Sequence, residues 1–241
     1  MKLVEDDTIK GTEPDRTGTD EPRVDDDGLG RLADERGITV DVLRAANIRT
    51  VSDGGRHDGW WRIPYPNRTG IWKSRYRNPN PESHPKYLDD QGATFHLYNP
   101  LRLGPGEDEV WFAEGEFDTL ALIDQGLKAI GIHGVSNTKT LAELSKDTDP
   151  DEPDPDTGRW KHSWQLLFQD TLCITMFDND EAGIGPGRML ARSLDGVAFD
   201  AWENGHNDVN DWHKADPDGL GDALNRFRYG VYRSRGIQPW E

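Results

Sequence analysis

From residue 109 onward, apolar residues occur in short continuous runs, each followed by a segment with helical spacing. Runs of this kind are typical of strands buried on both faces, and their alternation with helices is typical of a parallel sheet. The predicted strands are EVWFAE at 109–114, KAIGIH at 128–133, TLCITMF at 171–177 and VAFDAW at 197–202. The predicted helices lie near 117–125, 138–145, 182–194 and 218–228. The pattern therefore predicts an α/β fold with a doubly wound parallel sheet.

The chain before this region has a different pattern. Residues 28–48 predict two short helices, the first ending at Gly37 and the second N-capped by Thr39. The segments WWRIPY at 60–65 and GIWKSRYR at 70–77 alternate between apolar and polar positions, which predicts a β-hairpin. A small α+β subdomain is therefore expected ahead of the parallel sheet.

Composition narrows the class of protein. The 241 residues include 45 acidic and 28 basic side chains, for a net charge of −17, which argues against a protein that coats nucleic acid nonspecifically. The single cysteine, Cys173, excludes a disulfide framework and any cysteine-based zinc site within this chain. No apolar run is long enough for a membrane span, and the N-terminus is too acidic for a signal peptide. The sequence therefore predicts a cytoplasmic protein without a membrane partner, in the bacterial host if a phage encodes it.

Charge is distributed unevenly along the chain. The first 27 residues are acidic and lack aromatic residues, which predicts a disordered tail, and DTDPDEPDPD at 147–156 predicts a solvated insertion. Residues 56–88 contain seven basic and two acidic side chains. The predicted organisation is an acidic tail at 1–27, a basic N-terminal subdomain at 28–106, a parallel-sheet domain at 107–215 with an insertion at 147–160, and a C-terminal helix and tail at 216–241.

Three carboxylates stand at the ends of predicted strands. Glu114 ends the first strand, and Asp178 and Asp180 follow the third, just before a predicted helix. Ligands of open α/β sheets bind at the carboxyl ends of the strands, and the spacing of two places both aspartates on one side. Carboxylates that share a pocket repel one another and are stabilised by a hard cation such as Mg²⁺ or Mn²⁺. The alternative for Asp180 is an acid that simply favours a helix N-terminus.

The segments EGEFD at 114–118 and DNDEAG at 178–183 together resemble the TOPRIM domain of primases, topoisomerases and some nucleases. The resemblance implies that Glu114, Asp178 and Asp180 are the catalytic and metal-binding acids, with Asp118 as the second acid of the first motif. Asp118 has the alternative role of a first-turn acid. Gly115 would let the backbone approach a phosphate.

Further segments resemble bacterial-type replicative primases. These are HPKYLDD at 84–90, LYNP at 97–100, HNDVNDW at 206–212 and GVSN at 134–137. The resemblance implies that Asp208 lies near the metals and that Asn137 belongs to a loop that contacts substrate. It covers roughly residues 29–228, without the zinc-binding and helicase-binding modules of full-length primases.

The basic segment has a role in this interpretation. Arg75, Arg77, Lys86 and Tyr87 are expected to hold template phosphates or the incoming nucleoside triphosphate. The alternative for Arg75 and Lys86 is a solvated surface. Tryptophans such as Trp60 and Trp61 either stack on bases or fill the core of the subdomain.

The resemblance implies a DNA primase core, a DNA-directed RNA polymerase that makes short RNA primers on single-stranded DNA during replication, including phage replication. Its implied partners are single-stranded DNA, nucleoside triphosphates, a replicative helicase and a separate zinc-binding primase module, and its implied cofactors are two Mg²⁺ or Mn²⁺ ions. The alternatives are a metal-dependent TOPRIM nuclease using the same acids and a noncatalytic subunit that binds single-stranded DNA.

Overall fold

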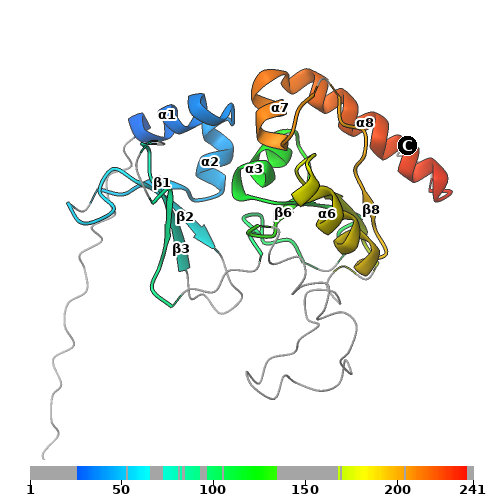
Figure 1. Cartoon of the computed structure of the whole chain (residues 1–241), viewed down its shortest axis with the longest axis horizontal. Coiled ribbons are helices and arrows are strands. Elements are labelled where there is room, and N and C mark those ends of the chain that lie inside the picture. Colours follow the sequence, from blue (N-terminus) through cyan, green and yellow to red (C-terminus); the bar gives the residue numbers. More distant parts are fainter. Residues whose placement is uncertain are drawn as a thin grey trace, which may run out of the picture.

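The computed structural model describes residues 26–134 and 168–237, except for 53, 66–72, 81, 83–84, 93–96, 105, 169 and 204. The described residues form two four-stranded sheets, which lie side by side in Figure 1. One sheet lies within the predicted segment 28–106 and the other within 107–215. The predicted helix at 138–145, the acidic tail before residue 26 and the insertion at 147–160 lie outside the described residues.

The N-terminal sheet is antiparallel, in the order β1-β2-β3-β4, with two short helices beside it. Its elements are α1 (Asp26–Arg36), α2 (Val40–Ala45), β1 (Arg49–Thr50), β2 (Trp61–Tyr65), β3 (Lys73–Arg77) and β4 (Tyr87–Asp89). The predicted helical pair and the predicted pairing of β2 with β3 are thereby confirmed. Trp61 is fully buried, and its indole N–H donates to the Gly28 carbonyl at 3.0 Å. Trp61 therefore belongs to the core.

Gly37 ends α1 as predicted, with a φ of +67° that favours glycine. A Cβ at this position would also come within 2.8 Å of the Lys214 backbone, so glycine lets the two parts of the chain pack closely. Thr39 stands at the predicted N-cap of α2, but its hydroxyl donates to Asp124 at 2.6 Å and makes no capping bond. The capping prediction is wrong for the side chain: a cap would accept from an N–H of the first turn of α2, whereas this hydroxyl is turned toward the Asp124 carboxylate, to which it donates.

The second sheet is parallel throughout, in the order β6-β5-β7-β8. Its strands are β5 (Glu109–Ala113), β6 (Ala129–Gly131), β7 (Leu172–Met176) and β8 (Val197–Ala198), and its helices are α3 (Glu116–Asp124), α6 (Glu181–Ser193), α7 (Val209–Ala215) and α8 (Pro217–Ser234). The four predicted strands and three of the predicted helices are present. The strand predicted at 197–202 is shorter, since β8 is at the sheet edge and Asp200 beyond it is exposed.

Both faces of the parallel sheet are covered. Trp111 and Ile174 pack in one cluster with α3, α7 and α8, whereas Phe112 and Cys173 pack in another with Leu190 of α6. Alternate residues of one strand point to opposite faces, which explains why β5 and β7 are buried at every position and are apolar except for Glu109 and Thr175. Mixed α/β architecture with a parallel sheet is therefore confirmed, while the finer doubly wound TOPRIM assignment stays a prediction.

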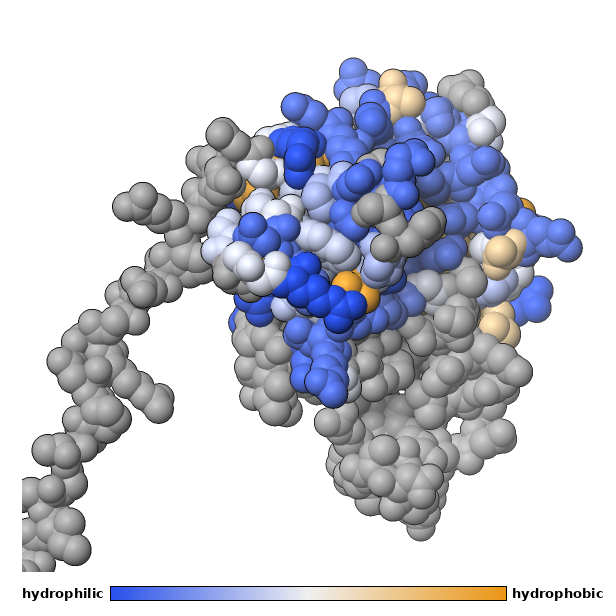
Figure 2. Space-filling model, turned by 60° about the vertical axis from the view of Figure 1, so that its left-hand side comes forward, coloured by the Kyte–Doolittle hydropathy of each residue, from blue (hydrophilic) through white to orange (hydrophobic). Residues whose placement is uncertain are grey.

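The exposed surface of the described residues is mainly polar. Figure 2 shows a predominantly hydrophilic face with isolated apolar residues. The large apolar side chains that are exposed are Leu101, Ile184, Tyr229 and Ile237, which come from separate segments. No helix in the described ranges has both the length and the apolar character needed to cross a bilayer.

Candidate active site at the carboxyl edge of the parallel sheet

Glu114 and Asp178 follow neighbouring strands at the same edge of the parallel sheet. β5 and β7 are parallel, with Ala113 opposite Met176, so the residues that follow them leave the sheet on one side. We call this side the carboxyl edge. Burial, together with the negative charge of Glu114 and three neighbouring aspartates, raises the pKa of Asp178 to about 7. The edge therefore concentrates acidic side chains, as the sequence predicts.

Asp118 reaches the same group of acids from the first turn of α3. Its Oδ1 accepts a hydrogen bond from the backbone N–H of Asn210 at 3.0 Å. Burial and the charges of Asp208 and Asp178 raise the pKa of Asp118 to about 7. Among the described residues, no lysine, arginine or histidine forms an ion pair with these three aspartates. Within the described part of the chain, the charge of these three aspartates is therefore only partly balanced, chiefly by Arg36 near Asp118 and Asp208.

Two of the aspartates also begin helices. Asp180 is the N-cap of α6, where its Oδ1 accepts from the Gly183 N–H at 2.8 Å. Asp208 is the N-cap of α7 and accepts from the Asp211 N–H at 2.6 Å; burial raises the pKa of Asp208. A helix-starting role for Asp180, the alternative to metal binding, is thus present in the structure. Gly183 is required here, since a Cβ would lie 2.3 Å from the Asp178 carbonyl oxygen.

The donor atoms at this edge are suited to a hard divalent cation. Carboxylate oxygens are the ligands that Mg²⁺ and Mn²⁺ prefer, and a cation would balance the charge that raises the pKa of Asp118 and Asp178. Within the part of the chain that the structure describes, no three Asp, Glu, His or Cys side chains are already grouped so that they could hold a metal ion. The chemical types of these residues therefore fit a divalent cation, and binding would require their carboxylate groups to move closer together.

A small hollow of about 120 Å³ lies directly beside the acids. Its acidic side includes Asp118 and Asp208, and its other side includes Arg36, Lys86 and Tyr87. Partial burial, with the positive charges of Arg77 and Arg36, lowers the pKa of Lys86. Positive and negative walls face one small space, an arrangement that suits a phosphate group together with its cation.

The four predicted nucleic-acid-binding residues occupy different environments. Lys86 is exposed, whereas Arg77 is buried with an ion pair to Glu35 at 2.7 Å and a hydrogen bond to the Tyr87 hydroxyl at 2.9 Å. Arg75 is half-buried and forms an ion pair with Glu116 at 2.9 Å. The structure therefore brings Lys86 and Tyr87 to the hollow, places Arg75 and Arg77 behind Tyr87, and does not describe Asn137.

The sequence indicates no role for three residues near the site: Glu116, Tyr65 and His133. Glu116 is buried and accepts hydrogen bonds from Tyr65 and Arg75, and His133 lies against the same carboxylate. Although burial opposes it, hydrogen bonding to His133 and the charge of Arg75 lower the pKa of Glu116 to about 2. The only sequence signal for Glu116 was that EGEFD contains a third acid, and an acid is common at the start of a helix.

Arg36 and Asn210 were also missed. The Asn210 amide donates to the Arg36 carbonyl at 2.7 Å, and the Arg36 guanidinium donates back to Asn210 at 3.2 Å. These bonds join α1 to the start of α7, directly behind Asp118. Because the two residues are 174 positions apart, no local pattern could have paired them.

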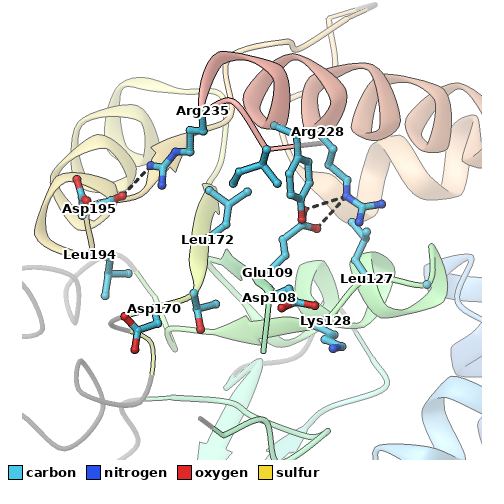
Figure 3. Close-up of a pocket in the computed structure, with 14 residues that line it drawn as sticks. Asp108, Glu109, Leu127, Lys128, Asp170, Leu172, Leu194, Asp195, Arg228 and Arg235 are labelled. Carbon is cyan, nitrogen blue, oxygen red and sulfur yellow. Dashed lines mark hydrogen bonds and ion pairs between the residues drawn. The ribbon is translucent and has the colours of Figure 1, made fainter. Parts of the chain in front are cut away.

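A larger hollow of about 770 Å³ lies at the opposite edge of the parallel sheet, beneath α8 (Figure 3). There Glu109 and Arg228 point toward each other and pair at 2.9 Å, and Arg235 donates to the Asp195 carbonyl at 2.8 Å. None of the buried side-chain atoms left without a hydrogen-bond partner in the described residues lies in this hollow. Ligands of open α/β sheets bind at the carboxyl ends of the strands, and this hollow lies at the other end, so we place the candidate active site at the carboxyl edge.

Comparison with solved structures identifies the fold. The primase fragment of the bacteriophage T7 primase-helicase is similar at 22% identity with a TM-score of 0.53, covering 77% of this chain and 70% of that one. A chain in a structure of the T7 lagging-strand DNA polymerase with primase domains, bound to an RNA/DNA hybrid and dTTP, matches at 20% identity with a TM-score of 0.50, covering 80% and 87%. No protein-family model matches, and no curated protein matches. The likeness shows that the chain has a primase-like fold.

Proposed function

We propose that this chain is a DNA primase core of the TOPRIM type, which synthesises short RNA primers on single-stranded DNA. The observation that carries the proposal is the concentration of acids at the carboxyl edge of a primase-like fold. There the charges of Glu114 and Asp208 raise the pKa of Asp178, and Asp118 lines one hollow together with Arg36 and Lys86. Joining nucleotides requires acids that hold cations and donors that hold phosphates, side by side.

In this proposal Glu114, Asp178 and Asp180 hold Mg²⁺ or Mn²⁺, with Asp118 and Asp208 beside them. Two such ions would supply activation of the attacking 3′-hydroxyl and neutralisation of the leaving pyrophosphate. Lys86 and Tyr87 orient phosphates from the basic side of the hollow, and Gly115 lets a phosphate approach the backbone. Asp118 and Asp178 release their protons when a cation is bound, since the charge that raises their pKa is then balanced.

The proposed partners follow from the reaction. The single-stranded template and the nucleoside triphosphates are substrates; the T7 neighbour was solved with an RNA/DNA hybrid and dTTP on its primase domains. A replicative helicase and a separate zinc-binding primase module are the proposed protein partners. A zinc-binding module added in trans should improve initiation at defined sites.

The test is incubation of the full chain with circular single-stranded DNA, labelled ribonucleotides and Mg²⁺ or Mn²⁺. The expected product is short RNA that is complementary to the template, and it should be absent without template or in EDTA. Shortened DNA without RNA product would replace the primase with a TOPRIM nuclease. Retention of DNA with neither product would indicate a noncatalytic binding subunit.

A further inference from the structure

A buried polar cluster joins the two sheets beside the candidate active site. We propose that Glu116 is a positioning residue, which together with Tyr65 fixes the guanidinium of Arg75 and thereby the ring of Tyr87 at the basic side of the hollow. For its catalytic consequence, this inference rests on the proposed primase function.

The cluster brings together residues from four elements. Tyr65 ends β2, Arg75 is the central residue of β3, Glu116 begins α3, and His133 follows β6. The Glu116 side chain is 4% exposed, and its Oε1 accepts hydrogen bonds from the Tyr65 hydroxyl and from Arg75 Nη1 at 2.9 Å. His133 Nδ1 lies 2.7 Å from the Tyr65 oxygen and 3.2 Å from Arg75 Nη1. One carboxylate oxygen therefore holds the antiparallel sheet against α3.

Arg75 is held at one end of its guanidinium. Nη1 donates to Glu116, whereas Nε, which lies 3.6 Å from Asp89, is buried without a hydrogen-bond partner among the described residues. The guanidinium carbon lies 4.1 Å from the centre of the Tyr87 ring, in a stacked cation–π contact. Because a guanidinium is planar and rigid, the bond of Nη1 to Glu116 and the ion pair of Nε with Asp89 together restrain the plane against which Tyr87 packs.

Tyr87 transmits this position to the hollow. Tyr87 lines the hollow together with Gly115, Glu116 and Asp118. The first turn of α3 therefore contains both Asp118, an acid of the site, and Glu116, which holds Arg75 and Tyr87 at the basic side. The spacing between the two sides is thus tied to one hydrogen-bonded group.

Stability alone is a weak reason for such a cluster. Taking a carboxylate and a guanidinium out of water costs about as much free energy as their attraction returns, and well-packed apolar residues often serve equally well. A buried charge pair does, however, fix orientation, because its hydrogen bonds have required directions. Glu109 and Arg228 form a comparable buried pair at the opposite edge of the same sheet and provide a matched control.

The first experiment compares Glu116→Gln with Glu109→Gln in primer synthesis by the full chain. We expect Glu116→Gln to raise KM for nucleotides about tenfold with kcat changed less than about threefold, because positioning of a binding residue is lost. Glu109→Gln should leave both constants within about twofold, although both variants lower the melting temperature. Tyr65→Phe, which removes only the hydroxyl, should raise KM in the same direction to a smaller extent.

Coupling to Arg75 separates positioning from a direct effect. Adding Glu116→Gln to Arg75→Ala should raise KM no further than Arg75→Ala alone, since Glu116 acts through that guanidinium. Additive effects, or equal KM changes in Glu116→Gln and Glu109→Gln, would overturn the inference. If Glu116→Gln fails to fold, Tyr65→Phe and its double variant with Arg75→Ala decide by the same criteria.

A readout without substrate keeps this inference distinct from the proposed function. ¹⁵N relaxation of arginine Nε–H groups should show Arg75 rigid in the parent and in Glu109→Gln, and as mobile in Glu116→Gln as the exposed Arg56. A rigid Arg75 in Glu116→Gln overturns the positioning role, whatever the activity. If the parent protein makes no primers, the primase function is wrong, and the relaxation result alone then tests the positioning role of Glu116.

Discussion

Strand β5 begins with Glu109 and is followed directly by Glu114, and the two glutamates lie in opposite electrostatic environments. Glu109, at the amino edge, is buried and paired with Arg228 at 2.9 Å, and it accepts from the Trp111 indole at 2.7 Å. Glu114, at the carboxyl edge, lies beside Asp178, whose pKa is raised to about 7 by burial and surrounding acids. At the amino edge, the carboxylate of Glu109 is therefore balanced by bonds within the protein. The carboxyl edge instead accumulates negative charge that a bound cation would balance, at a cost to the stability of the metal-free protein.

The largest expected contrast between the edges is in activity. Glu114→Gln and Asp178→Asn should each reduce nucleotide incorporation by at least about a hundredfold, because cation ligands stabilise the transition state by several kcal/mol. Glu109→Gln should retain activity within about twofold. Incorporation of labelled nucleotide into primers measures this, with far-UV circular dichroism to confirm folding. Full activity in both carboxyl-edge variants would contradict the assignment of the site.

Removal of the amino-edge carboxylate should produce the largest loss of stability. Glu109→Ala leaves the Arg228 guanidinium buried without its partner, which costs about 3 kcal/mol. For a chain of this size the melting temperature should fall by roughly 6–12 °C. Scanning calorimetry in EDTA is the measurement. A fall of only one or two degrees would show that the pair is effectively solvated.

The metal-free protein should have an unusual dependence on pH. The pKa of Asp118 and of Asp178 is about 7 in the folded protein against 3.8 for a free side chain, so the folded state binds more protons between these values. Stability in EDTA should therefore decrease as pH rises from about 4 to 7. Glu116 acts in the opposite sense, because its lowered pKa of about 2 gives stability that is lost as pH falls from 4.5 toward 2.

Thermal melts in EDTA should then show maximal stability near pH 4–4.5, with saturating Mg²⁺ removing the decline at higher pH. A flat profile between pH 5 and 8 in EDTA would contradict the carboxyl-edge interpretation.

Neutralising one carboxyl-edge acid should stabilise the protein in the absence of metal. Asp178→Asn keeps the shape of the side chain and removes part of the repulsion, which is worth about 1 kcal/mol after relaxation. In EDTA at pH 8 we expect a melting temperature roughly 2–4 °C above the parent, opposite in sign to Glu109→Ala. Excess Mg²⁺ should narrow or reverse the difference, because it stabilises the parent more. A lower melting temperature in EDTA would mean that Asp178 makes a structural bond.

The smallest effect is expected at Asp180, which both caps α6 and belongs to the acidic group. Asp180→Ala removes the acceptor for the Gly183 N–H and should cost about 0.5–1 kcal/mol in EDTA. Asp180→Asn retains a good N-cap, so it should melt at or above the parent temperature. Paired thermal melts of the two variants measure the difference. Equal melting temperatures would remove the capping role.

The sequence by itself determined most of the elements, though not α7 or β4, and the edge at which the acids gather. Continuous apolar runs predict strands buried on both faces, and the strand-end positions of Glu114 and Asp178 predict a common edge once the strands are parallel. Gly37 marks the end of α1 through its backbone alone. These features depend on neighbours within a few positions, which is why pattern and capping rules reach them. The domain boundaries and the role of Asn137 stay predictions.

Only the tertiary structure decided which polar groups pair. Thr39 bonds to Asp124 across 85 positions instead of capping its own helix, and Arg75 bonds to Glu116 across 41. Arg77 has the same residue type as Arg75 and lies two residues further on the same face of β3, yet it is buried and pairs with Glu35 of α1 instead of Glu116. Such pairings depend on how the two sheets pack together, and this packing sets the distances between groups that are remote in the sequence. Short-range periodicity contains no information about those distances, so the hydrogen bonds of Glu116 with Tyr65 and Arg75 could be found only in the folded chain.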